Sequence, residues 1–146
     1  LGGCKFEAMK RNSRSLVLSL CTFLCLGGCV QTPGEGGRGS IVGHIQEEAR
    51  LVLTNPSTAA APYAATDHDV FLIYGENIGP DDQVETNHQG DFVFPWLRPG
   101  DYTVYTYSKD TSGVVPARDM VVLQAVTIES NTQTVTLDTL TVFDNI

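Results

Sequence analysis

The three histidines are the side chains best suited to metal chemistry. Zinc sites usually show closely spaced ligands, as in HxH or HExxH, because such spacing places two ligands side by side on one element. No histidine in this sequence has such spacing. We therefore interpret His44, His68 and His88 as ordinary surface histidines, and we expect no metal with Asp67, Asp69 or Asp91 and no other cofactor.

Two acidic stretches and the serines offer further chemistry. Asp81-Asp82 with Glu85, or residues 87–91, would supply oxygen ligands for calcium, but the second stretch lacks the alternating carboxylates of a calcium loop. No serine lies in a GxSxG turn, and no carboxylate pair is marked by its spacing as a hydrolytic pair. We expect no catalytic residue and no enzyme. A small envelope enzyme with an unrecognised site stays open as an alternative.

Aromatic side chains form the feature that stands out most. Alternation along a strand places Tyr102 and Val104 on one face and Tyr105 and Tyr107 on the other. If the first pair faces the core, the two outer tyrosines, with Trp96 near them, would form a surface for a sugar ring or a partner protein. We favour a second interpretation, in which the loop of residues 55–66 covers this outer face, so that the strand is buried on both sides.

Residues 9–28 have the form of a bacterial export signal. Three cationic residues follow Met9, and residues 15–26 form a short apolar segment. Such a segment of about twelve residues is too short for a hydrocarbon core, which needs about 20 residues in a helix. We interpret residues 1–8, which precede Met9, as an upstream extension without structure.

The signal ends in Leu26-Gly27-Gly28-Cys29, which resembles the lipobox of bacterial lipoproteins. The resemblance implies cleavage before Cys29 and a thioether-linked diacylglycerol on its thiol. Because two or more acyl chains anchor a protein stably, we expect the protein to be attached to a membrane through the lipid on Cys29.

Processing at Cys29 would change the cysteine count and the charge. The other cysteines, Cys4, Cys21 and Cys25, all precede the cleavage site, so the mature chain would have no disulfide. Loss of four cations and Glu7 would change the net charge from −8 to −11. An acidic chain of this kind is not expected to bind nucleic acid or to attach to anionic lipid by charge.

The stretch Gly90–Tyr107 reads as two strands joined by a turn. Phe92 and Phe94 share one face of the first strand. Arg98-Pro99-Gly100-Asp101 is typical of a type II turn, since Pro99 favours the first central position and Gly100 the second. The pattern predicts a β-hairpin.

The same stretch carries a family resemblance. Residues 86–94 followed by residues 97–104 are similar to the pattern T-D-x-x-G-x-F-x-F-x-x-L-x-P-G-x-Y-x-V of carboxypeptidase regulatory-like domains. The similarity spans roughly residues 40–140. It implies a small β-sandwich of the transthyretin (prealbumin) type, and it implies no catalytic residue, because the family has none to transfer.

The rest of the chain fits one domain over residues 40–146, preceded by a flexible Gly-rich tether over residues 29–39. Short strands are expected at the following places: residues 41–45, 50–54, 70–74, 83–86, 120–128 and 133–137, with 140–143 as an extension of the last. Residues 120–128 and 133–137 are expected to pair with each other through a turn. No helical pattern follows Cys29, so the sequence predicts an all-β, Greek-key-type sandwich of about seven strands.

These features together favour a non-catalytic, membrane-anchored binding or structural module of the bacterial cell envelope. A surface-exposed adhesin-type module for a glycan or protein is the main alternative. No acidic cluster follows Cys29, and no aspartate stands directly after it. We therefore expect the outer membrane as the location, with the domain facing the periplasm.

Lipidation is the first testable prediction. We expect mass spectrometry of the mature protein to find an N-terminal Cys29 that carries acyl chains, and we expect Cys29→Ser to release the protein from the membrane fraction. An unmodified N-terminus upstream of Cys29, or a variant that fractionates as the parent does, would contradict the prediction.

Overall fold

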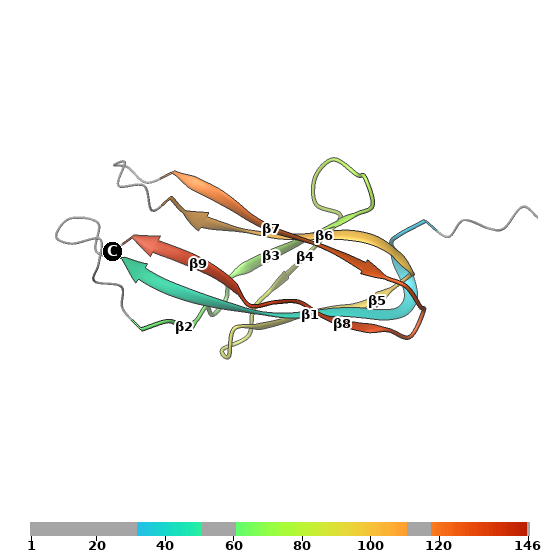
Figure 1. Ribbon diagram of the computed structural model, residues 1–146, viewed down its shortest axis with the longest axis horizontal. Helices are drawn as coiled ribbons and strands as arrows, with labels where there is room; N and C mark the ends of the chain where they lie inside the picture. Colours follow the sequence, from blue (N-terminus) through green and yellow to red (C-terminus); the bar gives the residue numbers. More distant parts are fainter. Residues whose placement is uncertain (1–31, 51–60, 111–117, 146) are drawn as a thin grey trace, which may run out of the picture. The chain divides into compact units, whose positions relative to one another are not determined.

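The computed structural model describes residues 32–50, 61–110 and 118–145, which belong to one compact unit. These residues form nine β-strands in two sheets, which Figure 1 shows as two layers. The predicted all-β sandwich is confirmed, with more strands than the seven or so expected, because the two-residue β2 was not predicted and residues 140–145 form a strand of their own. No helix in the described ranges is long and apolar enough to cross a membrane.

The first sheet is built around one long strand, β1 (Glu35–Arg50). One edge of β1 pairs in antiparallel fashion with β5 (Asp91–Leu97) and then with β2 (Tyr63–Ala64). The amide and the carbonyl of Ile45 mark the change of partner, since they bond to Gly90 and Ala65 respectively. The other edge pairs in parallel with β8 (Thr134–Thr136) and then with β9 (Leu140–Asn145).

The second sheet has four antiparallel strands in the order β4-β3-β6-β7. These are β4 (Asp82–Glu85), β3 (Asp69–Tyr74), β6 (Gly100–Lys109) and β7 (Asp119–Ile128). The predicted strands at 70–74 and 120–128 are therefore confirmed, and β3 is an inner strand of its sheet.

The core lies between the two sheets and follows the alternation of the strands. Phe92 and Phe94 of β5 are buried, and so are Tyr102, Val104 and Thr106 of β6, as the sequence predicted. The phenyl ring of Phe92 lies against Gly43 of β1. Only glycine leaves room for the ring there, since a Cβ at this position would overlap it. Burial of these apolar faces is the main favourable term for such a domain. The other core residues are Ile41, Ile45, Ala65, Val70, Leu72, Leu97, Val126, Ile128, Leu137, Leu140 and Val142.

The predicted hairpin of residues 90–107 is wrong. Strands β5 and β6 lie in different sheets, where β5 pairs with β1 and β6 pairs with β3 and β7. The turn at Arg98-Pro99 is a crossing from one sheet to the other. Gly100 has φ of 151°, far from the roughly +80° that a type II turn requires, and it already begins β6. Local turn residues do not reveal whether the strands beside them pair with each other.

The second predicted pairing is also wrong. Strand β7 pairs with β6, whereas β8 pairs in parallel with β1 in the opposite sheet. The turn at residues 129–132 is thus another crossing, and its amides at Glu129 and Ser130 are capped by the Gln133 side chain. Residues 140–143 belong to a separate strand, β9, which continues beside β1 after β8 ends.

The second half of the predicted tether belongs to the folded domain from Gly34 onward. Strand β1 starts at Glu35, five residues before the expected domain boundary. Gly34 is buried, its amide bonds to the Tyr102 hydroxyl at 2.9 Å, and its carbonyl accepts the Arg98 amide at 2.9 Å. Glycine is needed here for close packing, since a Cβ at Gly37 would overlap the Leu97 carbonyl. The predicted strand at 50–54 falls outside the described residues after Arg50, and so do residues 55–60 of the 55–66 loop.

A bulge interrupts β5 at Pro95-Trp96. Ile41 of β1 is opposite Phe94 and Gly39 is opposite Leu97, so β5 has one residue more than β1 in this interval. The bulge places both Pro95 and Trp96 outside and returns Leu97 to the core, where it is fully buried. Trp96 adopts φ of 62°, an uncommon conformation for a bulky residue.

The second prediction concerns the hydroxyl of Tyr102, which joins the start of the domain to the crossing between the sheets. It accepts the Gly34 amide and donates to the Arg98 carbonyl at 2.7 Å. Tyr102→Phe leaves both backbone groups without this partner in a buried place, so we expect the free energy of unfolding to fall by about 1–3 kcal/mol. Denaturant unfolding measures it, and trypsin should also cleave faster after Arg38.

Tyr107→Phe is the matched control, because it removes the same atom from a half-exposed side chain. We expect its stability to stay within about 0.5 kcal/mol of the parent. Equal unfolding midpoints for the parent and Tyr102→Phe would contradict the role given to this hydroxyl.

Candidate binding surface

The outer face of the four-stranded sheet carries side chains that align across strands. Phe71 of β3 is opposite Tyr105 of β6, which is in turn opposite Leu123 of β7. In the neighbouring row Tyr107 of β6 is opposite Val121 of β7. Because opposite positions point to the same face of a sheet, these five side chains form one surface, which we call the aromatic face.

The three rings of the aromatic face are ordered relative to one another. Phe71 and Tyr105 stack with ring centroids 5.0 Å apart and planes 19° apart. Tyr107 meets both at steep angles, 76° to Phe71 and 87° to Tyr105, with centroids 5.8 and 5.9 Å away. Neither neighbour therefore stacks in parallel on Tyr107. Such offset and edge-to-face pairs are the favourable aromatic arrangements, so the cluster is held in place before any ligand arrives.

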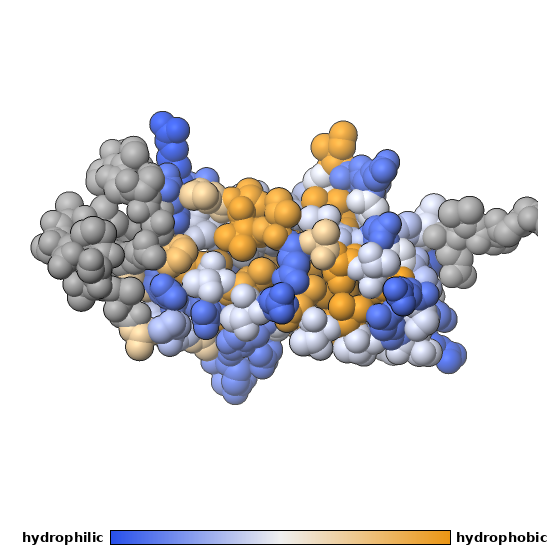
Figure 2. All heavy atoms as spheres, viewed as in Figure 1, coloured by the Kyte–Doolittle hydropathy of each residue, from blue (hydrophilic) through white to orange (hydrophobic). Residues whose placement is uncertain are grey.

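The aromatic face is accessible to solvent. Tyr107 is 47% exposed and Leu123 is 64% exposed, although both occur in regular strands. Figure 2 shows hydrophobic side chains gathered over β7 at this part of the molecule. Partial burial raises the pKa of Tyr105, with a smaller contribution from the neighbouring Tyr107 hydroxyl.

A planar polar pair lies beside the rings. Gln83 of β4 is opposite Phe71, and its side-chain amide donates to the Asp69 carboxylate at 2.7 Å. Both side chains are exposed. The free lone pairs and the second amide hydrogen of this pair remain able to bond with a ligand that lies on the rings.

The structure separates the three residues that the sequence grouped as a partner surface. Tyr105 and Tyr107 share the aromatic face, but Trp96 belongs to β5 in the other sheet. Sequence reasoning missed Phe71, although alternation within residues 70–74 would have placed it opposite the buried Val70 and Leu72. Its pairing with Tyr105 links residues 34 positions apart, and no local signal shows that.

The loop expected to cover the outer tyrosines runs elsewhere in its described part. Tyr63 and Ala64 pair with β1 in the first sheet, and the Ala65 amide bonds to Ile45. Residues 55–60 of that loop lie outside the described residues. The favoured interpretation, a covered β6, receives no support from residues 61–66.

His44 and several acidic groups are engaged in structural contacts. His44 pairs with Asp91 through Nδ1 and Oδ1 at 2.9 Å. Asn87 Oδ1 accepts the amides of Gln89 and Asp91, and the Asp81 carboxylate accepts the Tyr74 amide, so both candidate calcium stretches use these oxygens to close turns. Within the described ranges, no three His, Cys, Asp or Glu side chains are grouped as a metal site would require.

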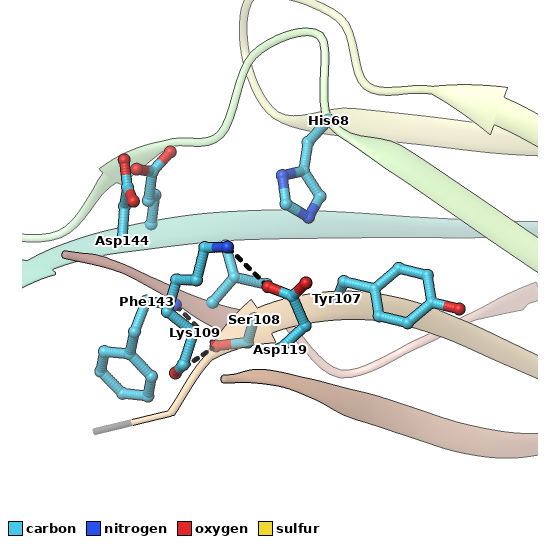
Figure 3. Close-up of a pocket in the computed structure, with 9 residues that line it drawn as sticks. His68, Tyr107, Ser108, Lys109, Asp119, Phe143 and Asp144 are labelled. Carbon is cyan, nitrogen blue, oxygen red and sulfur yellow. Dashed lines mark hydrogen bonds and ion pairs between the residues drawn. The ribbon is translucent and has the colours of Figure 1, made fainter. Parts of the chain in front are cut away.

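A cavity of about 360 Å³ lies between the two sheets, lined by His68, Ser108, Lys109 and Asp119 among others (Figure 3). The ammonium of Lys109 bonds to the Asp119 carboxylate, which raises the pKa of the lysine. The Ser108 hydroxyl accepts the Phe143 amide and donates to the Lys109 carbonyl. Its bonds are thus to backbone groups, and Figure 3 shows His68 on the other side of the cavity. A nucleophile with its base is not formed by these residues.

Comparisons with known proteins show no family for this chain. No family model matches the chain, and no curated protein matches its sequence. A crystal structure from Pseudomonas aeruginosa, described as that of a "putative carbohydrate binding protein", is similar with a TM-score of 0.45 and 17% identity over 72% of this chain and 90% of that chain. So distant a likeness carries no argument about function.

Proposed function

We propose that this protein is a non-catalytic binding module of the bacterial cell envelope, anchored through lipid on Cys29, and that the aromatic face is its ligand-binding surface. The observation that carries the proposal is the exposed, preordered cluster of Phe71, Tyr105 and Tyr107 on a regular sheet. Rigid strands hold binding groups more accurately than loops do.

The ligand that best fits this surface is an uncharged glycan. Tyr107 has no neighbour stacked in parallel on it, so a sugar ring can lie on its face, where the sugar's C–H groups meet the aromatic ring. The Gln83–Asp69 pair supplies planar donors and acceptors of the kind that bond to adjacent hydroxyls. None of the five residues of the aromatic face is charged, and the charges nearest Tyr107, those of Lys109 and Asp119, neutralise each other in an ion pair.

Binding rather than catalysis is the proposed activity for two reasons. The Ser108 hydroxyl, the candidate nucleophile of the cavity, is bonded to backbone groups on both sides. The carboxylate of Asp81 and the side-chain oxygen of Asn87 accept backbone amides that close turns, so these oxygens serve the fold. The module would thus bind the glycan or partner without changing it chemically.

A protein partner is the second candidate, favoured by the aliphatic side of the same face. Val121 and Leu123 on β7 are 50% and 64% exposed. Such aliphatic exposure next to tyrosines is typical of a protein interface core. The two ligand classes therefore depend on different residues of the surface.

The third prediction separates the two candidates. An array of uncharged envelope glycans would first identify an oligosaccharide, and calorimetry would then measure its affinity. We expect Tyr107→Ala to weaken binding roughly tenfold, which corresponds to about 1.4 kcal/mol, and Gln83→Ala to weaken it as well. Val93→Ala is the matched control, since Val93 is a similarly exposed apolar side chain on β5 in the other sheet, and this variant should bind the glycan as the parent does.

Two outcomes would contradict the glycan proposal. The parent could bind none of the glycans, or Tyr107→Ala could bind with unchanged affinity. If Leu123→Ala instead abolished capture of one envelope protein while Tyr107→Ala had no effect on any glycan, the protein-partner candidate would replace it.

A further inference from the structure

Trp96 is exposed to solvent because of the β-bulge in β5. Continued alternation after Phe92 and Phe94 would put position 96 in the core. The bulge instead moves Trp96 outside, where it is 66% exposed, and fills the core position with Leu97. A bulky residue with φ of 62° costs free energy, and conformations of this kind persist mostly where a function uses them.

Trp96 lies beside the first residues of the domain, those from Gly34 to Gly39. Leu97, the residue after Trp96, is opposite both Glu35 and Gly39 of β1. The next residue, Arg98, donates its amide to Gly34, and its guanidinium lies over Gly36. The exposed Arg38 is anchored at the same end through its amide, which bonds to Asn131.

The covalent chain keeps this end close to Cys29. Only three peptide units separate Cys29 from Thr32, and a fully extended chain spans at most about 3.6 Å per residue, so the two residues are within about 11 Å of each other. By the same measure, the flexible tether expected over residues 29–39 would have allowed up to about 40 Å. Because Gly34 is bonded to the domain, the slack of residues 34–39 is not available.

From this geometry we infer that the end of the sandwich bearing Trp96 rests on the membrane surface, with the Trp96 indole in the headgroup region. The inference rests on the proposed lipid anchor at Cys29. Tryptophan is the side chain that favours the membrane–water interface, since its ring is apolar and its N–H bonds with polar groups. Arg98 and Arg38 can lie along the same boundary with their charged ends in the headgroups.

Charge attraction is not what holds this surface to the lipid. Glu35 is exposed at the same end, and Glu129 lies at the turn after β7, so the two arginines are balanced by two carboxylates. The interaction needs no anionic lipid and fits a zwitterionic headgroup layer. The aromatic face remains free in this orientation: Tyr107 is seven residues along β6 from Gly100, or about 23 Å at the rise of a strand.

The sequence offers a direct probe, because Trp96 is the sole tryptophan of the chain. The exported protein, purified from membranes, would be reconstituted into phosphatidylcholine vesicles with and without lipids brominated on the acyl carbons nearest the headgroup. We expect a blue shift of the emission and loss of most of it in the brominated vesicles. Mass spectrometry of the same sample reports whether Cys29 carries acyl chains.

Two variants make the measurement specific. Ten Gly and Ser residues inserted between Gln31 and Thr32 keep Trp96 but lengthen the connection, so the quenching should fall strongly. The double variant Trp96→Phe and Tyr107→Trp moves the tryptophan to the aromatic face, where we expect no quenching. Both variants should keep the acyl chains and stay with the vesicles.

The possible results separate this inference from the proposed anchor. Unquenched emission from a protein that is acylated overturns the inference and leaves the anchor in place, and so does quenching that the insertion does not change. A protein without acyl chains on Cys29 overturns both.

Discussion

Strand β1 is paired along both of its edges, and the rest of the structure depends on this constraint. One edge is taken by β5 and β2 and the other by β8 and β9. The strand that follows β5 pairs neither with β1 nor with the outer edge of β5, and the chain crosses to the second sheet at Arg98-Pro99. The chain crosses back at residues 129–132, where it leaves β7 for the second edge of β1. Each crossing stacks one apolar face on the other, which produces the core.

The aromatic face and the exposed Trp96 both depend on these crossings. Because β6 leaves the first sheet, its odd-numbered residues align with Phe71 on the outside of the second sheet and form the aromatic face. The crossing also fixes Arg98 to Gly34, and the bulge before it exposes Trp96. The proposed ligand surface and the end of the sandwich that carries Trp96 thus belong to one strand–crossing–strand segment, but they lie at different distances from Gly34, where the domain begins.

Local patterns in the sequence predicted what depends on neighbouring residues. Alternation correctly assigned the buried faces of β5 and β6, and turn residues and the lack of helical periodicity led to an all-β sandwich. Strand partners could not be predicted, since the Arg98-Pro99 turn has the same residue types whether it closes a hairpin or crosses between sheets. The glycines before Ser40 suggested a flexible tether, whereas they allow close backbone packing against Leu97. Phe71 was missed because strand partners could not be predicted, and its neighbour Tyr105 is remote in sequence.

The central structural claim is that the domain begins at Gly34 and not at residue 40, since the distance from the membrane depends on it. Amide hydrogen exchange measured residue by residue tests this most directly. We expect the amides of Gly34 and Arg98 to be protected, because they bond to the Tyr102 hydroxyl and to the Gly34 carbonyl. The Ile45 amide, bonded to Gly90 within the core, serves as the internal reference. Exchange of the Gly34 and Arg98 amides at the rate of an unstructured chain, with Ile45 still protected, would contradict the claim.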